Sequence, residues 1–195
     1  MIIFSLSISL ITALIGLLLE KRAIIAVSYG IIVPLVVFLP RFIYKFDSKV
    51  RNIVNWKWVK KLELFAFFII ILNAPGSLIL HDLNFQYDRF LHLFGAFFAF
   101  IIFFLLWFPV LKIKGKKIEK RNFLLFVLIT LFIALFFWEA LQITIDTVFG
   151  TKLFFDQSQT IEVDFSEDIS FGLLGLIAAL IYLNYSFNKF LSVLK

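Results

Sequence analysis

The chain contains, near its middle, the sequence Phe97-Phe98-Ala99-Phe100-Ile101-Ile102-Phe103-Phe104, eight consecutive residues with no polar side chain. A helix at the surface of a soluble protein has one polar face, so a run that is apolar on all faces is expected to be buried or surrounded by lipid. The composition of the whole chain favours lipid over a buried position in a soluble protein, because 62% of the 195 residues are hydrophobic and the mean hydropathy is +1.01. This composition lies far outside the range of soluble domains, and it predicts an all-α integral membrane protein.

Six apolar segments are long enough, or nearly so, to cross a hydrocarbon core of about 30 Å, which takes roughly 20 helical residues. They cover about residues 2–19, 23–39, 62–80, 89–111, 123–145 and 169–185. We therefore expect a single transmembrane domain, residues 1–195, built as a bundle of about six helices. The third helix contains Ala74-Pro75-Gly76, and proline removes a backbone donor, so we expect this helix to be broken near Pro75 and Gly76.

Basic residues predict the orientation of the bundle. Seven of them lie in segment 41–61 and six in segment 112–121, each time with a single acidic residue. Because Lys and Arg accumulate in cytoplasmic loops, both segments and both termini are predicted to be cytoplasmic, in a cell membrane (plasma or inner membrane) that the chain crosses several times. Segment 41–61 also contains apolar and aromatic residues, which fit either an irregular loop or an interfacial amphipathic helix on the anionic inner leaflet.

Composition also excludes several classes of function. The chain has no cysteine, which rules out disulfides, thiolate catalysis and cysteine-ligated metals. The net charge of +6 comes from the two basic segments, without an aromatic stacking platform or a basic recognition helix, so no nucleic-acid partner is expected. Membrane lipids are the expected partners, and the outer loop described next is a candidate docking site for a protein partner. The oligomeric state is left open.

Acidic residues gather at the other ends of the apolar segments. Residues three or four apart share one face of a helix. Three polar stripes have such spacing: Asp88 with His92, Glu139 with Gln142, and Asp164 with Asp168. Because lipid penalises polar side chains, the stripes are predicted to face one another at the outer face of the membrane. Residues 146–167 are predicted to form an acidic outer loop.

This cluster is a candidate site for a divalent cation. Its candidate metal ligands are Asp88, His92, Glu139, Asp164 and Asp168. Carboxylates with an imidazole bind Mg²⁺, Mn²⁺, Ca²⁺ or Zn²⁺, and such an ion can bridge to the phosphate of a lipid headgroup. The same groups suit general acid–base chemistry, with His92, Glu139 and Asp168 as candidate catalytic residues, and the residues alone leave open whether the protein is an enzyme. In the alternative structural interpretation, Arg89 and His92 neutralise a few carboxylates and hold the bundle together.

Three motifs carry a resemblance to a known family. They are Tyr87-Asp88-Arg89-Phe90-Leu91-His92, Trp138-Glu139-Ala140-Leu141-Gln142, and Asp164-Phe165-Ser166-Glu167-Asp168 followed by Gly175. Their order and spacing resemble the VanZ-like superfamily of small membrane proteins, and within it the YjdF-like inner-membrane branch. The resemblance covers roughly residues 87–180. It implies a multi-span membrane protein, in some VanZ relatives one linked to tolerance of glycopeptide antibiotics. The motif positions that match are Asp88, Arg89, His92, Glu139, Gln142, Asp164, Asp168 and Gly175. From their chemistry we predict that the residues that bind a ligand or headgroup are Asp88, Arg89, His92, Glu139, Gln142, Asp164 and Asp168.

Three functions fit these observations. In the first, the acidic site at the outer face binds or processes a phosphorylated or glycosylated envelope lipid with the help of a divalent metal. In the second, the protein is a non-catalytic membrane partner or scaffold whose acids dock another protein. In the third, it is a small ion-coupled transporter, for which the broken third helix and the intramembrane Glu139 are the motivating features.

Overall fold

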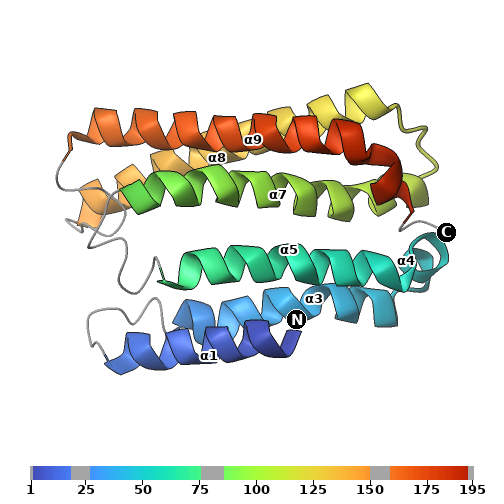
Figure 1. Ribbon diagram of the computed structural model, residues 1–195, viewed down its shortest axis with the longest axis horizontal. Helices are drawn as coiled ribbons and strands as arrows, with labels where there is room; N and C mark the ends of the chain where they lie inside the picture. Colours follow the sequence, from blue (N-terminus) through green and yellow to red (C-terminus); the bar gives the residue numbers. More distant parts are fainter. Residues whose placement is uncertain (1, 19–26, 76–85, 150–158, 193–195) are drawn as a thin grey trace.

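A computed structural model describes residues 2–18, 27–75, 86–149 and 159–192, and this part of the chain is built of helices without a β-strand (Figure 1). The elements are α1 (Ile2–Leu18), the π-helix η1 (Ser28–Ile32), α3 (Val33–Phe46), α4 (Ser48–Ile53), α5 (Trp56–Pro75), α7 (Gln86–Ile113), α8 (Lys120–Phe149) and α9 (Ile161–Leu191). The prediction of an all-α membrane protein is confirmed.

Four stretches of the described helices are long and apolar enough to cross a membrane. They are Tyr29–Phe46, Tyr87–Ile113, Lys120–Ile145 and Ile161–Leu191. The other two predicted spans correspond to α1 and α5. Helix α1 is apolar but has only 17 residues, and α5 has charged residues in its first half, including Lys60, Lys61 and Glu63. The described part of α5 ends at Pro75, so Gly76, the second residue of the predicted break, lies outside the described residues.

The helices form two groups that lie side by side (Figure 1). One group contains α1, α3 and α5, and the other contains α7, α8 and α9, with α5 packed against α7. Among the described helices, the most extensive contact is between α7 and α9. Gly175 allows this contact, because a β-carbon at residue 175 would overlap the carbonyl oxygen of Leu93. Small residues let helices in membranes approach to backbone contact in this way.

The two ends of the bundle differ in charge. At one end, which we call the basic end, lysine and asparagine side chains donate hydrogen bonds to backbone carbonyls near the end of α9. Lys61 Nζ donates to the Lys189 carbonyl at 3.1 Å, Lys120 Nζ to the Asn184 carbonyl at 2.7 Å, and Asn55 Nδ2 to the Ser192 carbonyl at 3.0 Å. Cations are favourable at a helix C-terminus, so these contacts fix α9 against its neighbours there.

Segment 41–61 is mostly helical, so the structure differs from an irregular loop. It consists of the end of α3, the short helix α4 and the start of α5. The Asp47 carboxylate begins α4 by accepting hydrogen bonds from the backbone N–H groups of Lys49, at 2.8 Å, and Val50, at 3.2 Å. Its placement on a lipid surface stays a prediction.

At the opposite end, which we call the acidic end, the helices are longer than the apolar segments. Helix α8 continues to Phe149, and α9 begins at Ile161 after Thr160, whose side chain accepts a hydrogen bond from the Val163 N–H. The predicted outer loop at 146–167 is therefore helical at both of its ends. The helical start of α9 gives the residues of the last acidic motif a fixed position relative to α7 and α8.

Candidate functional site

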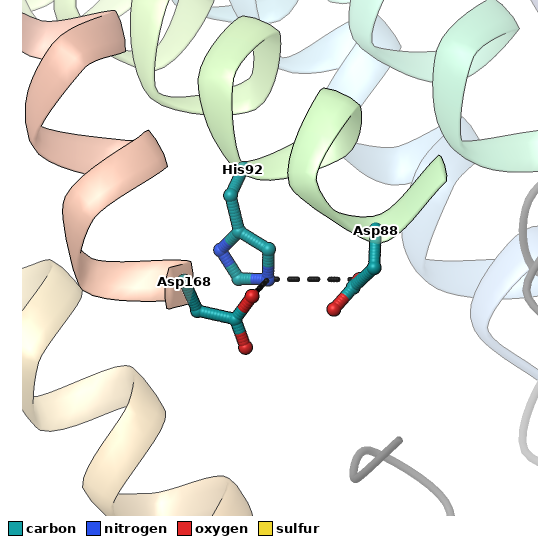
Figure 2. Close-up of side chains that lie close together, drawn as sticks. All are labelled: Asp88, His92 and Asp168. Atoms are coloured by element: carbon teal, nitrogen blue, oxygen red, sulfur yellow. Dashed lines mark ion pairs between the residues drawn. The ribbon is translucent and has the colours of Figure 1, made fainter. Parts of the chain in front are cut away.

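Helices α7, α8 and α9 bring four of the predicted site residues together at the acidic end. Asp88 and His92 come from α7, Glu139 from α8 and Asp168 from α9. Figure 2 shows the imidazole of His92 with the carboxylates of Asp88 and Asp168 close to its Nε2 atom. The prediction that the polar stripes of these helices face one another holds for these four residues.

One nitrogen of His92 faces two carboxylates from different helices. The Nε2 atom lies 3.6 Å from Asp88 Oδ1 and 3.5 Å from Asp168 Oδ1. One ligand atom from each of the three residues falls within 4.8 Å of the other two. Asp168 is almost fully buried, while the side chains of His92 and Asp88 keep 13% and 15% of their surface exposed. The cluster is therefore largely buried, with some exposed surface on His92 and Asp88.

The other nitrogen of His92 faces a third carboxylate. The Nδ1 atom lies 3.5 Å from Glu139 Oε1, and Glu139 is only 3% exposed. Within the described part of the chain, this oxygen is buried without a hydrogen-bond partner. Glu139 is not one of the three residues whose ligand atoms converge. It lies on a different side of the imidazole ring from Asp88 and Asp168.

Local sequence explains why these side chains meet. Asp88 lies in the first turn of α7, where the positive end of the helix dipole favours a carboxylate, and the i, i+4 spacing sets His92 on the same face. Gly175 lies against Leu93, the residue that follows His92, and this contact holds α9 close to α7. Asp168 is two helical turns before Gly175 on the same face of α9, so it reaches the His92 side chain.

Arg89 contacts Glu167, an acid that is not among the predicted site residues. Its Nε atom donates to Glu167 Oε2 at 2.9 Å, its Nη2 atom donates to the same oxygen, and its guanidinium lies 5.9 Å from the centre of the Phe171 ring. The ion pair joins α7 to α9 beside the cluster, which agrees with the counter-ion role in the structural interpretation. The signal in the sequence that could have predicted this ion pair is the position of Glu167, directly before Asp168 in the last acidic motif.

The remaining candidates, Asp164 and Gln142, are not among the three converging residues. Asp164 lies one turn before Asp168 on α9 and is not part of the converging set. Gln142 follows Glu139 on α8, and its Oε1 atom is buried with no hydrogen-bond partner among the described residues. Asp164 and Gln142 therefore remain candidate ligand-binding residues only because of their positions on α9 and α8.

The cluster is rich in carboxylates. Asp88, Glu139 and Asp168 place three carboxylates around a single imidazole. Burying negative charge without compensation is expensive in a medium of low dielectric constant. A bound cation or bound protons would offset this charge. The arrangement can therefore hold a divalent cation or hold and release protons.

A comparison with known protein families assigns the chain. The family described as "Predicted membrane protein (DUF2238)" matches residues 2–189. The chain belongs to this family. The DUF2238 match includes His92 and the three acidic residues around it, and it agrees with the prediction of a membrane protein that crosses the bilayer several times. No curated protein and no solved structure matches the chain. The VanZ-like resemblance is finer than the DUF2238 assignment and stays a prediction.

Proposed function

We propose that this membrane protein binds a divalent metal ion through Asp88, His92 and Asp168, and through that ion the phosphate of an envelope lipid headgroup. The observation that carries the proposal is the convergence of one imidazole nitrogen and two carboxylates, from two helices, within 4.8 Å. Imidazole and carboxylate are common protein ligands for divalent metals.

The spacing of the ligand atoms supports this proposal. For metal–ligand bonds of about 2.0–2.2 Å, two ligands of a tetrahedral ion lie roughly 3.3–3.6 Å apart. The distances from His92 Nε2 to the Asp88 and Asp168 carboxylates, 3.6 Å and 3.5 Å, agree with this separation. An ion could therefore enter with little movement of these side chains.

The lengths of the helices support a site at the level of lipid headgroups. Helix α9 has 31 residues and is therefore about 46 Å long, well beyond a hydrocarbon core of about 30 Å. Asp168 lies within the first about 11 Å of that helix, and Asp88 lies in the first turn of α7. With the apolar centre of each helix in the hydrocarbon, both carboxylates reach the depth of phosphate groups.

The distribution of charge supports the outer leaflet as the source of that lipid. Basic residues concentrate at the basic end of the bundle, in segments 41–61 and 112–121. By the positive-inside rule that end is cytoplasmic, which makes the acidic end the outer one. A metal ion held there would attract a phosphate that the acidic residues alone would repel.

Native mass spectrometry of the gently solubilised protein tests the proposal. The wild-type protein is loaded with Zn²⁺ or Mn²⁺, then mixed with phosphatidylglycerol, and compared with the Asp168→Asn variant and the matched control Glu162→Gln on the same helix. We expect metal and metal-dependent lipid adducts in the wild type and the control, and neither in the variant. Equal adducts in all three proteins, or lipid adducts that survive removal of the metal by EDTA, would contradict it. A lipid adduct displaced by inorganic phosphate would identify phosphate as the recognised group.

A further inference from the structure

The two nitrogens of His92 have different neighbours, and this asymmetry has a chemical meaning. Nε2 faces the two carboxylates that converge with it, whereas Nδ1 lies 3.5 Å from Glu139 Oε1. A histidine that ligates a metal through one nitrogen usually donates the N–H of the other to a carboxylate or a carbonyl. That hydrogen bond fixes the tautomer and the orientation of the ring, and it makes the ligating nitrogen more basic.

We infer that Glu139 is the orienting partner of His92 and not a metal ligand, and that the resulting centre selects Zn²⁺ over Mg²⁺ and Ca²⁺. The inference rests on the metal ion of the proposed function. With Glu139 excluded, the protein ligands are His92 Nε2 and the carboxylates of Asp88 and Asp168, and a phosphate oxygen would take a further coordination position. Mg²⁺ and Ca²⁺ prefer oxygen-only ligand sets, so the imidazole disfavours them.

The state of the Glu139 carboxylate supports this role. Its Oε1 atom is almost fully buried, has no hydrogen-bond partner in the described chain, and points toward the imidazole. A buried acceptor without a donor is costly, and the His92 Nδ1–H is the donor that would satisfy it. An N–H···O hydrogen bond is usually about 2.9–3.0 Å long, so a side-chain movement of roughly 0.5 Å would form it.

Helix packing holds Glu139 in this place. Leu135 lies one turn before Glu139 on the same face of α8, and its side chain fills the space left by the missing β-carbon of Gly172. Gly172 in turn lies one turn after Asp168 on α9. The contact between Leu135 and Gly172 therefore sets the distance between the Glu139 and Asp168 side chains, and keeps them on different sides of the His92 ring.

The test measures which nitrogen binds the metal and how tightly. The chain has two histidines, so a His81→Gln background leaves His92 as the single histidine for ¹⁵N-histidine NMR with Zn²⁺. We expect Zn²⁺ on Nε2 and a proton on Nδ1. We also expect Glu139→Ala to weaken Zn²⁺ binding by about 10- to 100-fold, the usual range for outer-shell partners. Glu139→Gln, which keeps a neutral acceptor, should weaken it less.

Several outcomes separate this inference from the proposed function. Zn²⁺ on Nδ1, or a Glu139→Ala affinity within twofold of the starting protein, would overturn the inference and leave the metal site standing. Complete loss of the metal in a folded Glu139→Gln variant would make Glu139 a ligand, which also overturns it. Mg²⁺ or Ca²⁺ binding as tight as Zn²⁺ binding would overturn the selectivity. A starting protein that binds none of these ions would contradict the proposed function itself. Glu162→Gln is the matched control, and helicity by circular dichroism shows whether each variant folds.

Discussion

Gly175 of α9 lies against the carbonyl oxygen of Leu93 in α7, so closely that a β-carbon at residue 175 would overlap this oxygen. The atom in the way belongs to the backbone, and a change of rotamer cannot move it aside. The helix pair that carries Asp88, His92 and Asp168 is therefore held at a separation that only glycine permits.

Gly175→Ala should push α9 away from α7 and weaken both folding and metal binding. Overpacking of this kind typically costs about 1–3 kcal/mol, and the separation of Asp168 from His92 should lower Zn²⁺ affinity at least about tenfold. Thermal unfolding in detergent and metal titration measure the two effects. Gly95→Ala on α7 is the matched control, because a β-carbon at residue 95 meets nothing within 4 Å. A Gly175→Ala protein as stable as the control would show that the two helices can separate freely.

Asp164→Asn should leave metal binding nearly unchanged, although the sequence analysis predicts Asp164 as a ligand. Its carboxylate is outside the set of ligand atoms that converge on His92 Nε2, so its removal changes only the surrounding charge. Asp168→Asn, one turn later on the same helix, should abolish binding. Isothermal titration with Zn²⁺ compares the two variants directly. Equal losses in both would place Asp164 in the ligand set.

Arg41→Ala should destabilise the protein far from the acidic end. Arg41 of α3 forms an ion pair with Glu63 of α5, and Glu63 is only 4% exposed. Without Arg41 the buried carboxylate has lost its cation, which we expect to cost at least about 2 kcal/mol in the free energy of unfolding.

The double variant Arg41→Ala/Glu63→Leu supplies the control for that prediction. It removes the buried charge together with its partner, so it should recover most of the lost stability. Thermal unfolding of the single and double variants gives the answer. A double variant as unstable as Arg41→Ala would show that packing by the arginine side chain, and not its charge, is what matters.

Much of the site follows from helical periodicity alone. The spacing of Asp88 and His92 requires only that residues 88–92 are helical, and lipid then drives their face toward the other polar stripes. The same reasoning correctly predicts that Glu139 and Asp168 join them. This prediction needs no knowledge of tertiary structure, because polar side chains in a bilayer are favourable only when they face the interior of the helix bundle.

The start of α9 and the rotation of α8 cannot be predicted from the lengths of the apolar segments. Hydrophobicity alone predicts that the last membrane span begins at residue 169, whereas α9 begins at Ile161. The helix starts earlier because Thr160 caps it and because the negative charges of Glu162 and Asp164 are favourable at the positive end of the helix dipole. The partition of the carboxylates between the two nitrogens of His92 depends on the rotation of α8, which the contact of Leu135 with Gly172 sets. Packing against neighbouring helices sets the rotation of a helix about its axis, so this rotation can hardly be predicted from the sequence of one helix that is apolar on all faces.

The division of the described chain into two helix groups also has an evolutionary consequence. His92 and the three carboxylates around it come from α7, α8 and α9, while α1 and α3 contact α5 and one another and supply none of these residues. Substitutions in α1 and α3 are thus constrained by packing and by the thickness of the host bilayer, and those at residues 88, 92, 139 and 168 by chemistry. Among relatives, α1 and α3 should therefore diverge in sequence while keeping their hydrophobicity, apart from the ion-paired Arg41, and the acidic end should keep its side chains.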